Sequence, residues 1–122
     1  MNNLEQATKT ATIANNASLS DAMTLGSNRT LVGVITPSTW TAAAITFKVS
    51  MDDVTYYPLM DSTGTEVIIP SASIPTGAAW ACALDPRNFV GWKYVKIQSG
   101  TNASNVNQGG ARSVIVVLRE VN

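Results

Sequence analysis

Residues 45–51, with the sequence ITFKVSM, alternate apolar and polar side chains, and this pattern constrains the fold more than any other in the chain. Successive side chains of a β-strand point to opposite faces, so the alternation predicts a strand with one buried side. Asp52 and Asp53 follow as a turn, and the aromatic and apolar residues of TYYPLM supply a returning strand. The sequence therefore predicts a β-hairpin over residues 44–60.

Further strands are predicted where apolar or β-branched runs lie between turn residues. Residues 30–36 (TLVGVIT) form one such run, which ends at Pro37, and Gly33 inside it indicates a β-bulge or a close neighbour. Residues 9–13 and 18–25 predict a first hairpin, and residues 66–69, 79–84 and 93–98 predict three shorter strands. The longest apolar run, residues 112–121, predicts a central strand that is covered on both faces.

Sequence signals for a helix are confined to one turn, in which Asp85 is a predicted N-cap and Pro86 is the first helical residue. Residues 100–110 (GTNASNVNQGG) predict a long exposed loop. Eight or so strands separated by turns predict an all-β fold, an antiparallel β-sandwich that is jelly-roll-like. We expect one such domain over residues 8–122, preceded by a flexible N-terminal arm of residues 1–7. The expected core contains Phe47, Val49, Val95, Ile97, Val114, Val116 and Leu118.

Charged residues make up only 13% of the chain, and its acidic and basic residues cancel. Nucleic-acid binding needs clustered Lys and Arg, which are dispersed here, so nucleic acid is not an expected partner. Net charge normally keeps proteins apart in solution, so a surface this poor in charge is suited to packing against another protein. No stretch approaches the roughly 20 apolar residues of a membrane span, and we expect a soluble protein with no membrane partner and no secretion signal.

The chain has no histidine and one cysteine, Cys82, which removes the usual general base, Cys–His catalysis and a zinc site. We expect Cys82 to be a small buried apolar residue. Asp61 begins the turn DSTG, and turn capping explains it better than a glycosidase carboxylate pair or a calcium site. The sequence therefore predicts a protein that is not an enzyme and that uses no metal and no cofactor.

Aromatic side chains give the main binding signal, because a flat ring stacks on the apolar face of a sugar. The candidate glycan-facing residues are Trp40, Tyr57 and Trp80. Trp92 and Tyr94 lie on the nominally polar face of the predicted strand KYVKIQ, which indicates a subunit contact. The candidate partner interface therefore combines these two residues with the start of the arm: Met1, Asn2, Asn3, Leu4, Trp92 and Tyr94.

Two long stretches carry a family resemblance, LVGVITPSTWTAAAITFKVSMDDVTYYPLMDSTGTEV and ALDPRNFVGWKYVKIQSGTNASNVNQGGARSVIVVLRE. They resemble short virion structural proteins of tailed bacteriophages and prophages, in which a W-T-A-A-x-I/L-T-F segment precedes S-x-D-x-x-T-Y. In that group an A-L-D-P segment also precedes a Y-x-K-I/L-x-S-G-T strand. The portions FKVSMDDVTYYPL and WKYVKIQSG are also similar to discoidin and carbohydrate-binding jelly rolls, although Asp53 stands where those modules often have glycine.

The phage resemblance implies a capsid decoration or cement protein that binds the major capsid protein on the outside of the head and stabilises it. It implies a protein made in the host bacterial cytoplasm and located in the virion, at the capsid surface. We also expect a homo-oligomer, with a trimer favoured, because a symmetric lattice strengthens several weak attachments at once. The alternative is a glycan- or host-surface-binding module of a phage head or tail fibre.

Overall fold

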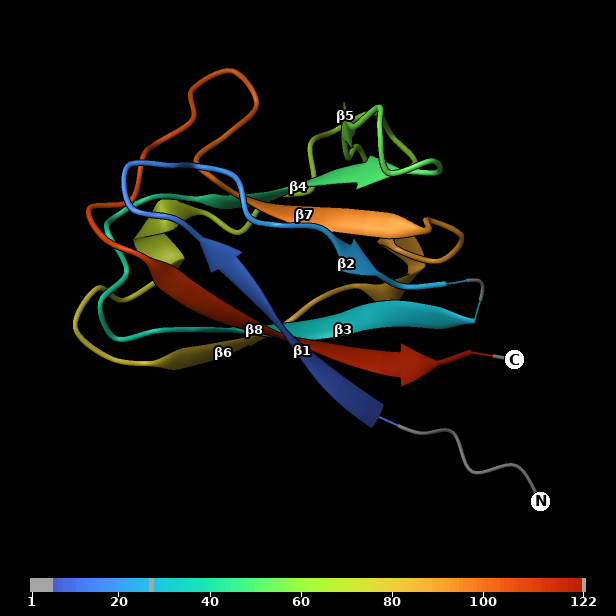
Figure 1. The fold of residues 1–122 in the computed structure, drawn as a ribbon, viewed down its shortest axis with the longest axis horizontal. Coiled ribbons are helices and arrows are strands. Elements are labelled where there is room, and N and C mark those ends of the chain that lie inside the picture. Colours follow the sequence, from blue (N-terminus) through green and yellow to red (C-terminus); the bar gives the residue numbers. More distant parts are fainter. Residues whose placement is uncertain (1–5, 27, 122) are drawn as a thin grey trace.

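The computed structural model describes residues 6–26 and 28–121, and in this part of the chain eight β-strands stack as two antiparallel sheets (Figure 1). In spatial order, the first sheet contains β1 (Gln6–Ile13), β8 (Arg112–Glu120), β3 (Arg29–Thr36) and β6 (Trp80–Ala83). The second contains β2 (Met23–Thr24), β7 (Tyr94–Ser99), β4 (Ile45–Ser50) and β5 (Tyr57–Pro58). The predicted all-β sandwich is confirmed.

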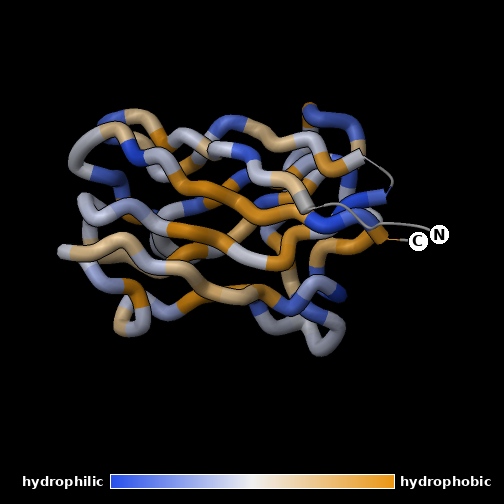
Figure 2. The backbone as a smooth tube through the Cα atoms, turned by 90° about the horizontal axis from the view of Figure 1, so that it is seen from below, coloured by the Kyte–Doolittle hydropathy of each residue, from blue (hydrophilic) through white to orange (hydrophobic). Residues whose placement is uncertain are grey.

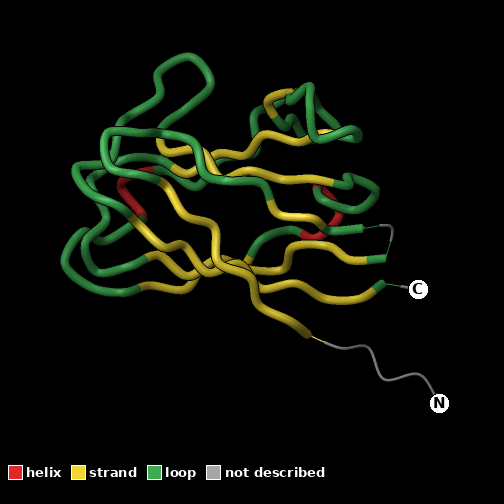
Figure 3. Tube along the Cα trace, viewed as in Figure 1, coloured by secondary structure: helices red, strands yellow, loops and turns green. Residues whose placement is uncertain are grey.

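The strands pair in a nested order, first with last: β1 with β8, β2 with β7, β3 with β6, and β4 with β5. A long antiparallel ribbon that is rolled up in this way forms the two sheets of a jelly roll. Helical structure in the described residues is limited to two 3-10 turns, η1 (Ser71–Ser73) and η2 (Pro86–Asn88), seen as short red segments in Figure 3. The Asp85 carboxylate accepts a hydrogen bond from the Arg87 N–H, which confirms the predicted N-cap.

The predicted hairpin is present as β4 and β5, with a tip that is fixed by side-chain capping. The Asp52 carboxylate accepts hydrogen bonds from the N–H groups of Val54 and Thr55, both at 2.9 Å. Asp53 has a φ of 61°, a left-handed conformation that glycine adopts most readily. Aspartate is among the residues that tolerate this conformation best after glycine, so Asp53 fits the turn.

The core lies between the two sheets and includes all seven residues expected there, each at most 1% exposed. The predicted irregularity at Gly33 is also confirmed, because the register of β3 against β8 shifts between Leu31 and Gly33. A Cβ atom at Gly33 would lie 3.2 Å from the Cys82 carbonyl oxygen, so glycine lets β6 approach closely.

Three strand predictions need correction. A single isolated bridge joins Ile13 to Ser20, but residues 9–13 and 18–25 do not form the predicted two-stranded hairpin, because β1 pairs with β8 whereas β2 pairs with β7 in the other sheet. Residues 66–69 form only isolated bridges, which join Glu66 to Met60 and Ile69 to Ile45. β8 is central in its sheet, as predicted, but only one of its faces is covered, since Ile115 is 36% exposed.

Residues 100–110 depart from a simple exposed loop because Gln108 inside them is completely buried. Its side-chain amide accepts a hydrogen bond from the Thr41 N–H at 2.8 Å and donates to the Thr41 carbonyl at 3.1 Å. The same amide donates to Ser99 Oγ at 2.8 Å. Gln108 thus holds the loop against the sandwich in the way a paired strand would.

The N-terminal strand begins earlier than expected, since Gln6 and Ala7 belong to β1 and pair with Arg119 and Leu118. The rest of the predicted arm, residues 1–5, lies outside the described residues. Within the residues that the structure describes, there is no helix long and apolar enough to cross a membrane.

Candidate functional site

The outer surface of the β1-β8-β3-β6 sheet carries two rows of uncharged residues that run across all four strands. The strand registers place Thr10, Ile115, Ile35 and Ala81 in one row and Thr8, Val117, Gly33 and Ala83 in the next. We call these eight residues the uncharged face. Figure 2 is viewed from the side of this sheet and shows hydrophobic, orange backbone through its central strands. Such a face is suited to contact with another protein rather than with water.

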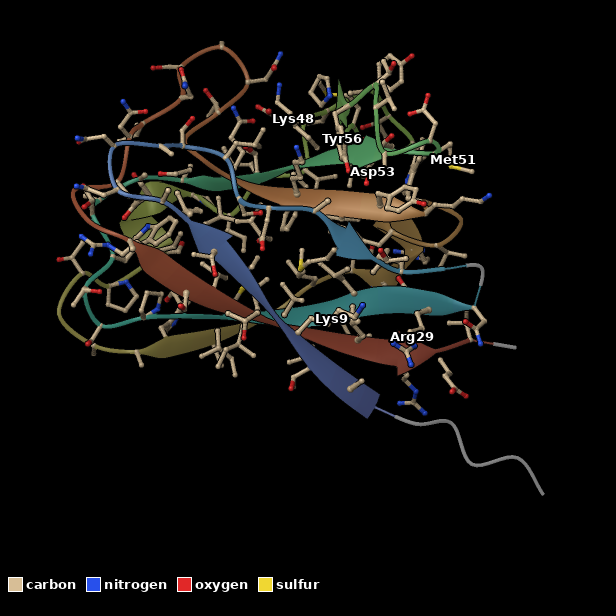
Figure 4. The ribbon with its side chains drawn as sticks, viewed as in Figure 1. Lys9, Arg29, Lys48, Met51, Asp53 and Tyr56 are labelled. Atoms are coloured by element: carbon tan, nitrogen blue, oxygen red, sulfur yellow. The ribbon has the colours of Figure 1, made fainter. Side chains whose placement is uncertain are left out.

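The opposite surface of the sandwich, over β4 and β7, is charged. Lys48 and Lys96 are directly opposite each other in the strand register. The Lys96 Nζ lies 4.4 Å above the centre of the Tyr56 ring, and the Tyr56 hydroxyl donates a hydrogen bond to the Asp53 carboxylate. Figure 4 shows Lys48, Tyr56 and Asp53 together on this side, away from Lys9 and Arg29. The two broad faces of the molecule therefore differ in chemistry.

Burial and the bond to Asp53 raise the pKa of Tyr56 well above its usual range. Tyr56 therefore keeps its proton and acts as a donor that ties the hairpin tip to the sheet.

A groove opens along one side of the sandwich, between the edges of the two sheets. One wall is the inner side of β6, with Trp80, Cys82 and Leu84, and the other is the segment 66–70. That segment is fixed to the second sheet, because the Val67 N–H donates to the Leu59 carbonyl and the Ile69 N–H donates to the Ile45 carbonyl. We call this hollow, with a volume of about 490 Å³, the edge groove.

The part of the edge groove that lies against β6 is apolar, because β6 has only four residues and the opposing sheet does not fully cover its inner side chains. Trp80, Cys82 and Leu84 pack against the core while staying only partly buried. Ile68, on the other wall, is 42% exposed. The groove thus offers apolar surface next to the end of a sheet, a common setting for binding extended chains.

A second hollow of about 570 Å³ adjoins the edge groove, since Asp61, Asp85 and Asn88 line both. Its other lining residues are Met60, Ser62, Arg87 and Trp92. This hollow combines an indole ring with carboxylates, an amide and a guanidinium. We call it the Trp92 hollow.

The carboxylates of the Trp92 hollow are held by local hydrogen bonds. The Thr63 hydroxyl and the N–H groups of Thr63 and Thr65 donate to Asp61 and hold its pKa below its usual range. This confirms that Asp61 caps its turn. Arg87 forms a salt bridge with Asp85 at 2.9 Å, and its hydrogen bonds lower the pKa of that carboxyl. Both carboxylates therefore stay ionised over a wide pH range.

The candidate glycan-facing residues do not converge on one surface. Trp40 is only 2% exposed and its Nε1–H donates to the Ala43 carbonyl, so the expected stacking role for Trp40 is wrong. Tyr57 is 59% exposed and shares a smaller hollow of about 270 Å³ with Trp92. Trp80 lines the edge groove instead.

The candidate partner interface falls only partly within the described residues. Trp92 is half-buried in the hollow that bears its name, and Tyr94 is half-buried on the charged side of β7. Met1, Asn2, Asn3 and Leu4 lie outside the described residues.

Sequence reasoning predicted neither the edge groove nor the uncharged face. Cys82 was expected to be buried but is half-exposed in the edge groove. The uncharged face depends on the β1-β8-β3-β6 strand order, which no local pattern reveals, although the alternation of buried and exposed residues in β8 indicates a solvent-facing side. In the part of the chain that the structure describes, no group of three or more His, Cys, Asp or Glu side chains is placed to hold a metal ion.

No protein-family model matches the sequence, and a search of curated proteins finds no match. Among solved structures, the chain is similar to one described as the cyanophage Pam1 capsid asymmetric unit. The two share 15% sequence identity with a TM-score of 0.39, and the similarity covers 98% of this chain and 86% of the other.

Proposed function

We propose that this protein is a non-enzymatic virion structural protein of a tailed phage, and that it is a decoration or cement protein on the outside of the head. Its partner is the major capsid protein. The observation that carries the proposal is the uncharged face, whose two rows extend across four strands without a charged side chain. The phage-like W-T-A-A and A-L-D-P segments of the sequence support the virion setting.

The difference between the two broad faces of the sandwich explains how such a protein is oriented on a shell. An uncharged sheet face loses little hydration when it is covered, because it has no ionic groups to desolvate. Lys48, Lys96 and Asp53 on the opposite side keep that surface hydrated. We therefore place the uncharged face against the capsid and the Lys48 side toward solvent.

Binding to purified capsids tests this assignment. Ile115 lies in the middle of the uncharged face, and Ile115→Lys should reduce occupancy on capsids of the cognate phage by at least about tenfold. Val90→Lys is the matched control, because Val90 is 51% exposed and lies outside the uncharged face. Normal occupancy of the Ile115→Lys variant would remove the uncharged face as the docking surface.

The Trp92 hollow supports a second candidate function, a glycan-binding module of a head or tail fibre. An indole beside Asp61, Asn88 and Arg87 is a composition typical of sugar sites, where a ring stacks and polar groups bind hydroxyls. A glycan array with the wild-type protein and the Trp92→Ala variant tests this alternative. It becomes the better proposal if the wild-type protein does not bind capsids and if Trp92→Ala abolishes a glycan signal.

A further inference from the structure

Among the residues that the structure describes, β6 is the last strand of its sheet, with one edge paired and the other free. It pairs with β3 on one side, where the Leu84 N–H donates to the Val32 carbonyl at 3.0 Å. On the same side the Trp80 carbonyl accepts a hydrogen bond from Thr36 Oγ1 at 3.4 Å. Main-chain groups along an antiparallel strand alternate in direction, so residues 80, 82 and 84 face β3.

The same alternation points the main-chain N–H and C=O groups of Ala81 and Ala83 away from β3. Sheet edges are usually protected by a charged side chain, a proline, a bulge or the shortness of the strand. β6 is short, with four residues, but its sequence, Trp-Ala-Cys-Ala, has no charge and no proline, its pairing with β3 has no bulge, and the side chains of Ala81 and Ala83 are small and exposed. The free edge of β6 is therefore open to another strand.

The edge groove lies beside this free edge. The residues that line it have the same two-residue spacing as the side chains on one face of a β-strand. The side chains of Trp80, Cys82 and Leu84 face the groove at intervals of two residues. A strand added to β6 would place every second side chain opposite them. Those side chains would be apolar, because Ile68 and Ile69 form the other wall.

The charge of the groove indicates which charge the ligand carries at one of its ends. Three carboxylates, of Asp61, Glu66 and Asp85, and one guanidinium, of Arg87, line the edge groove and the Trp92 hollow, which gives a net charge of minus two. Asp85 lies two residues beyond the end of β6, so the acidic end lies beyond the C-terminal end of this strand. A strand antiparallel to β6 brings its own N-terminal end to that position.

We propose that the edge groove binds an extended polypeptide segment, which adds a strand antiparallel to the free edge of β6. Alternate side chains of the segment are apolar and fill the groove, and a Lys or Arg at its N-terminal end meets Asp61 and Asp85. Main-chain hydrogen bonds to Ala81 and Ala83 hold it in register. This site shares Ala81 and Ala83 with the uncharged face, but it uses their main-chain groups at the edge of the sheet and the side chains of the groove, and its existence does not depend on capsid binding.

The synthetic peptide acetyl-KTVTVTV-amide is a probe with this chemistry. In the proposed register its three valines lie opposite Leu84, Cys82 and Trp80, and its lysine extends toward Asp85. Its second and third threonines lie opposite Ala83 and Ala81, so their N–H groups donate to the protein. N-methylation of these two threonines should weaken binding by at least about tenfold, because it removes both donors. N-methylation of the first two valines, whose N–H groups face solvent, should have a much smaller effect.

Titration of the full chain by NMR provides the measurement. The amide resonances of Ala81 and Ala83 should shift more than that of Cys82, whose N–H is already bonded within the sheet. A peptide with glutamate in place of lysine should bind at least about fivefold more weakly. Absence of binding at millimolar peptide, or equal binding of the two N-methylated peptides, would overturn the proposal.

A matched pair of variants tests the same point on the protein. Ala83→Pro removes the free-edge N–H without breaking a bond to β3, and proline is tolerated on edge strands. Ala83→Ser keeps the N–H. The proline variant should bind the peptide at least about tenfold more weakly than the serine variant, with both variants folded by circular dichroism. Equal affinity would rule out strand addition at β6 and leave capsid binding through the uncharged face untouched.

Discussion

The rings of Phe47 and Phe89 meet edge to face, with centroids 4.9 Å apart and an interplanar angle of 82°. Phe47 lies in β4, and Phe89 follows the η2 turn that Asp85 and Pro86 begin. Both rings are completely buried. This pair fixes the η2 turn, and with it the acidic end of the edge groove, to the core of the sandwich.

Truncation of either ring should destabilise the protein strongly. We expect Phe47→Ala and Phe89→Ala each to lower the free energy of unfolding by about 3–5 kcal/mol, because each leaves a cavity. The double variant should show a coupling of about 0.5–1.5 kcal/mol, the usual value of an aromatic pair. Urea unfolding measures all three values, and a loss below about 1 kcal/mol for Phe47→Ala would contradict its place in the core.

Gln108 should contribute more to stability than its position in a glycine- and asparagine-rich loop indicates. Gln108→Leu keeps the side-chain volume but leaves the Thr41 N–H, the Thr41 carbonyl and Ser99 Oγ without these partners. We expect a loss of about 2–4 kcal/mol in the free energy of unfolding. Asn107→Leu is the control, since Asn107 is exposed, and its effect should stay within about 0.5 kcal/mol. Similar effects for the two variants would remove the proposed role of Gln108.

The surface carboxylates predict a loss of stability in acid. Hydrogen bonds lower the pKa of Asp61 from its ordinary value of 3.8. A carboxyl with a lowered pKa stabilises the folded state above its unfolded pKa, and this stabilisation is lost as the pH falls through the folded pKa. The free energy of unfolding should therefore fall below about pH 4, and Asp61→Asn, which does not titrate, should lose less between pH ~5 and pH ~2.5. Identical pH profiles for the two proteins would contradict this contribution of Asp61.

The strands and turns of the fold were predictable where their signals are local. The alternation in residues 45–51 gave β4, its buried face and the hairpin with β5, and the cap at Asp85 gave the η2 turn. The pairing of β1 with β8 joins residues 99 to 113 positions apart, and no periodicity within either strand specifies its partner. This explains why the predicted first hairpin is reduced to a single bridge, between Ile13 and Ser20.

The candidate site was not predictable, because it too depends on segments that are far apart in the sequence. The edge groove brings segment 66–70 next to β6, and it exists because the sheets end there, not because of a motif. Aromatic residue type also predicted exposure poorly, since Trp40 fills the core whereas Tyr57 is largely exposed. Burial of a large ring depends on where its strand or turn lies in the sandwich.

Oligomeric state is a separate prediction, for which we expect a trimer at micromolar concentration by sedimentation velocity. Tyr94 is half-buried on the outer side of β7, and Tyr94→Glu should shift the protein toward monomer if this residue lies in a subunit contact. Val54→Glu is the control, because Val54 is 81% exposed at the hairpin tip. A protein that is monomeric both in solution and on capsids would contradict the prediction, whereas a dimer would change only its symmetry.

The residues before β1 are predicted to strengthen attachment to the shell, and the structure shows where a deletion must stop. β1 begins with the pair of Gln6 and Arg119, and Thr8 belongs to the uncharged face through its pair with Val117. Removing residues 1–8 would therefore alter the proposed docking surface together with the arm. Removing residues 1–5 leaves all eight β1–β8 pairs in place.

We expect the deletion of residues 1–5 to leave the midpoint of urea unfolding unchanged and to lower occupancy on purified capsids. A short polar segment can order on binding and add main-chain hydrogen bonds with little demand on its sequence. Heat release of packaged DNA gives the functional readout, because a cement protein that detaches earlier stabilises the shell less. If the shortened protein binds and protects as well as the full chain, residues 1–5 have no part in attachment, and the uncharged face accounts for capsid binding alone.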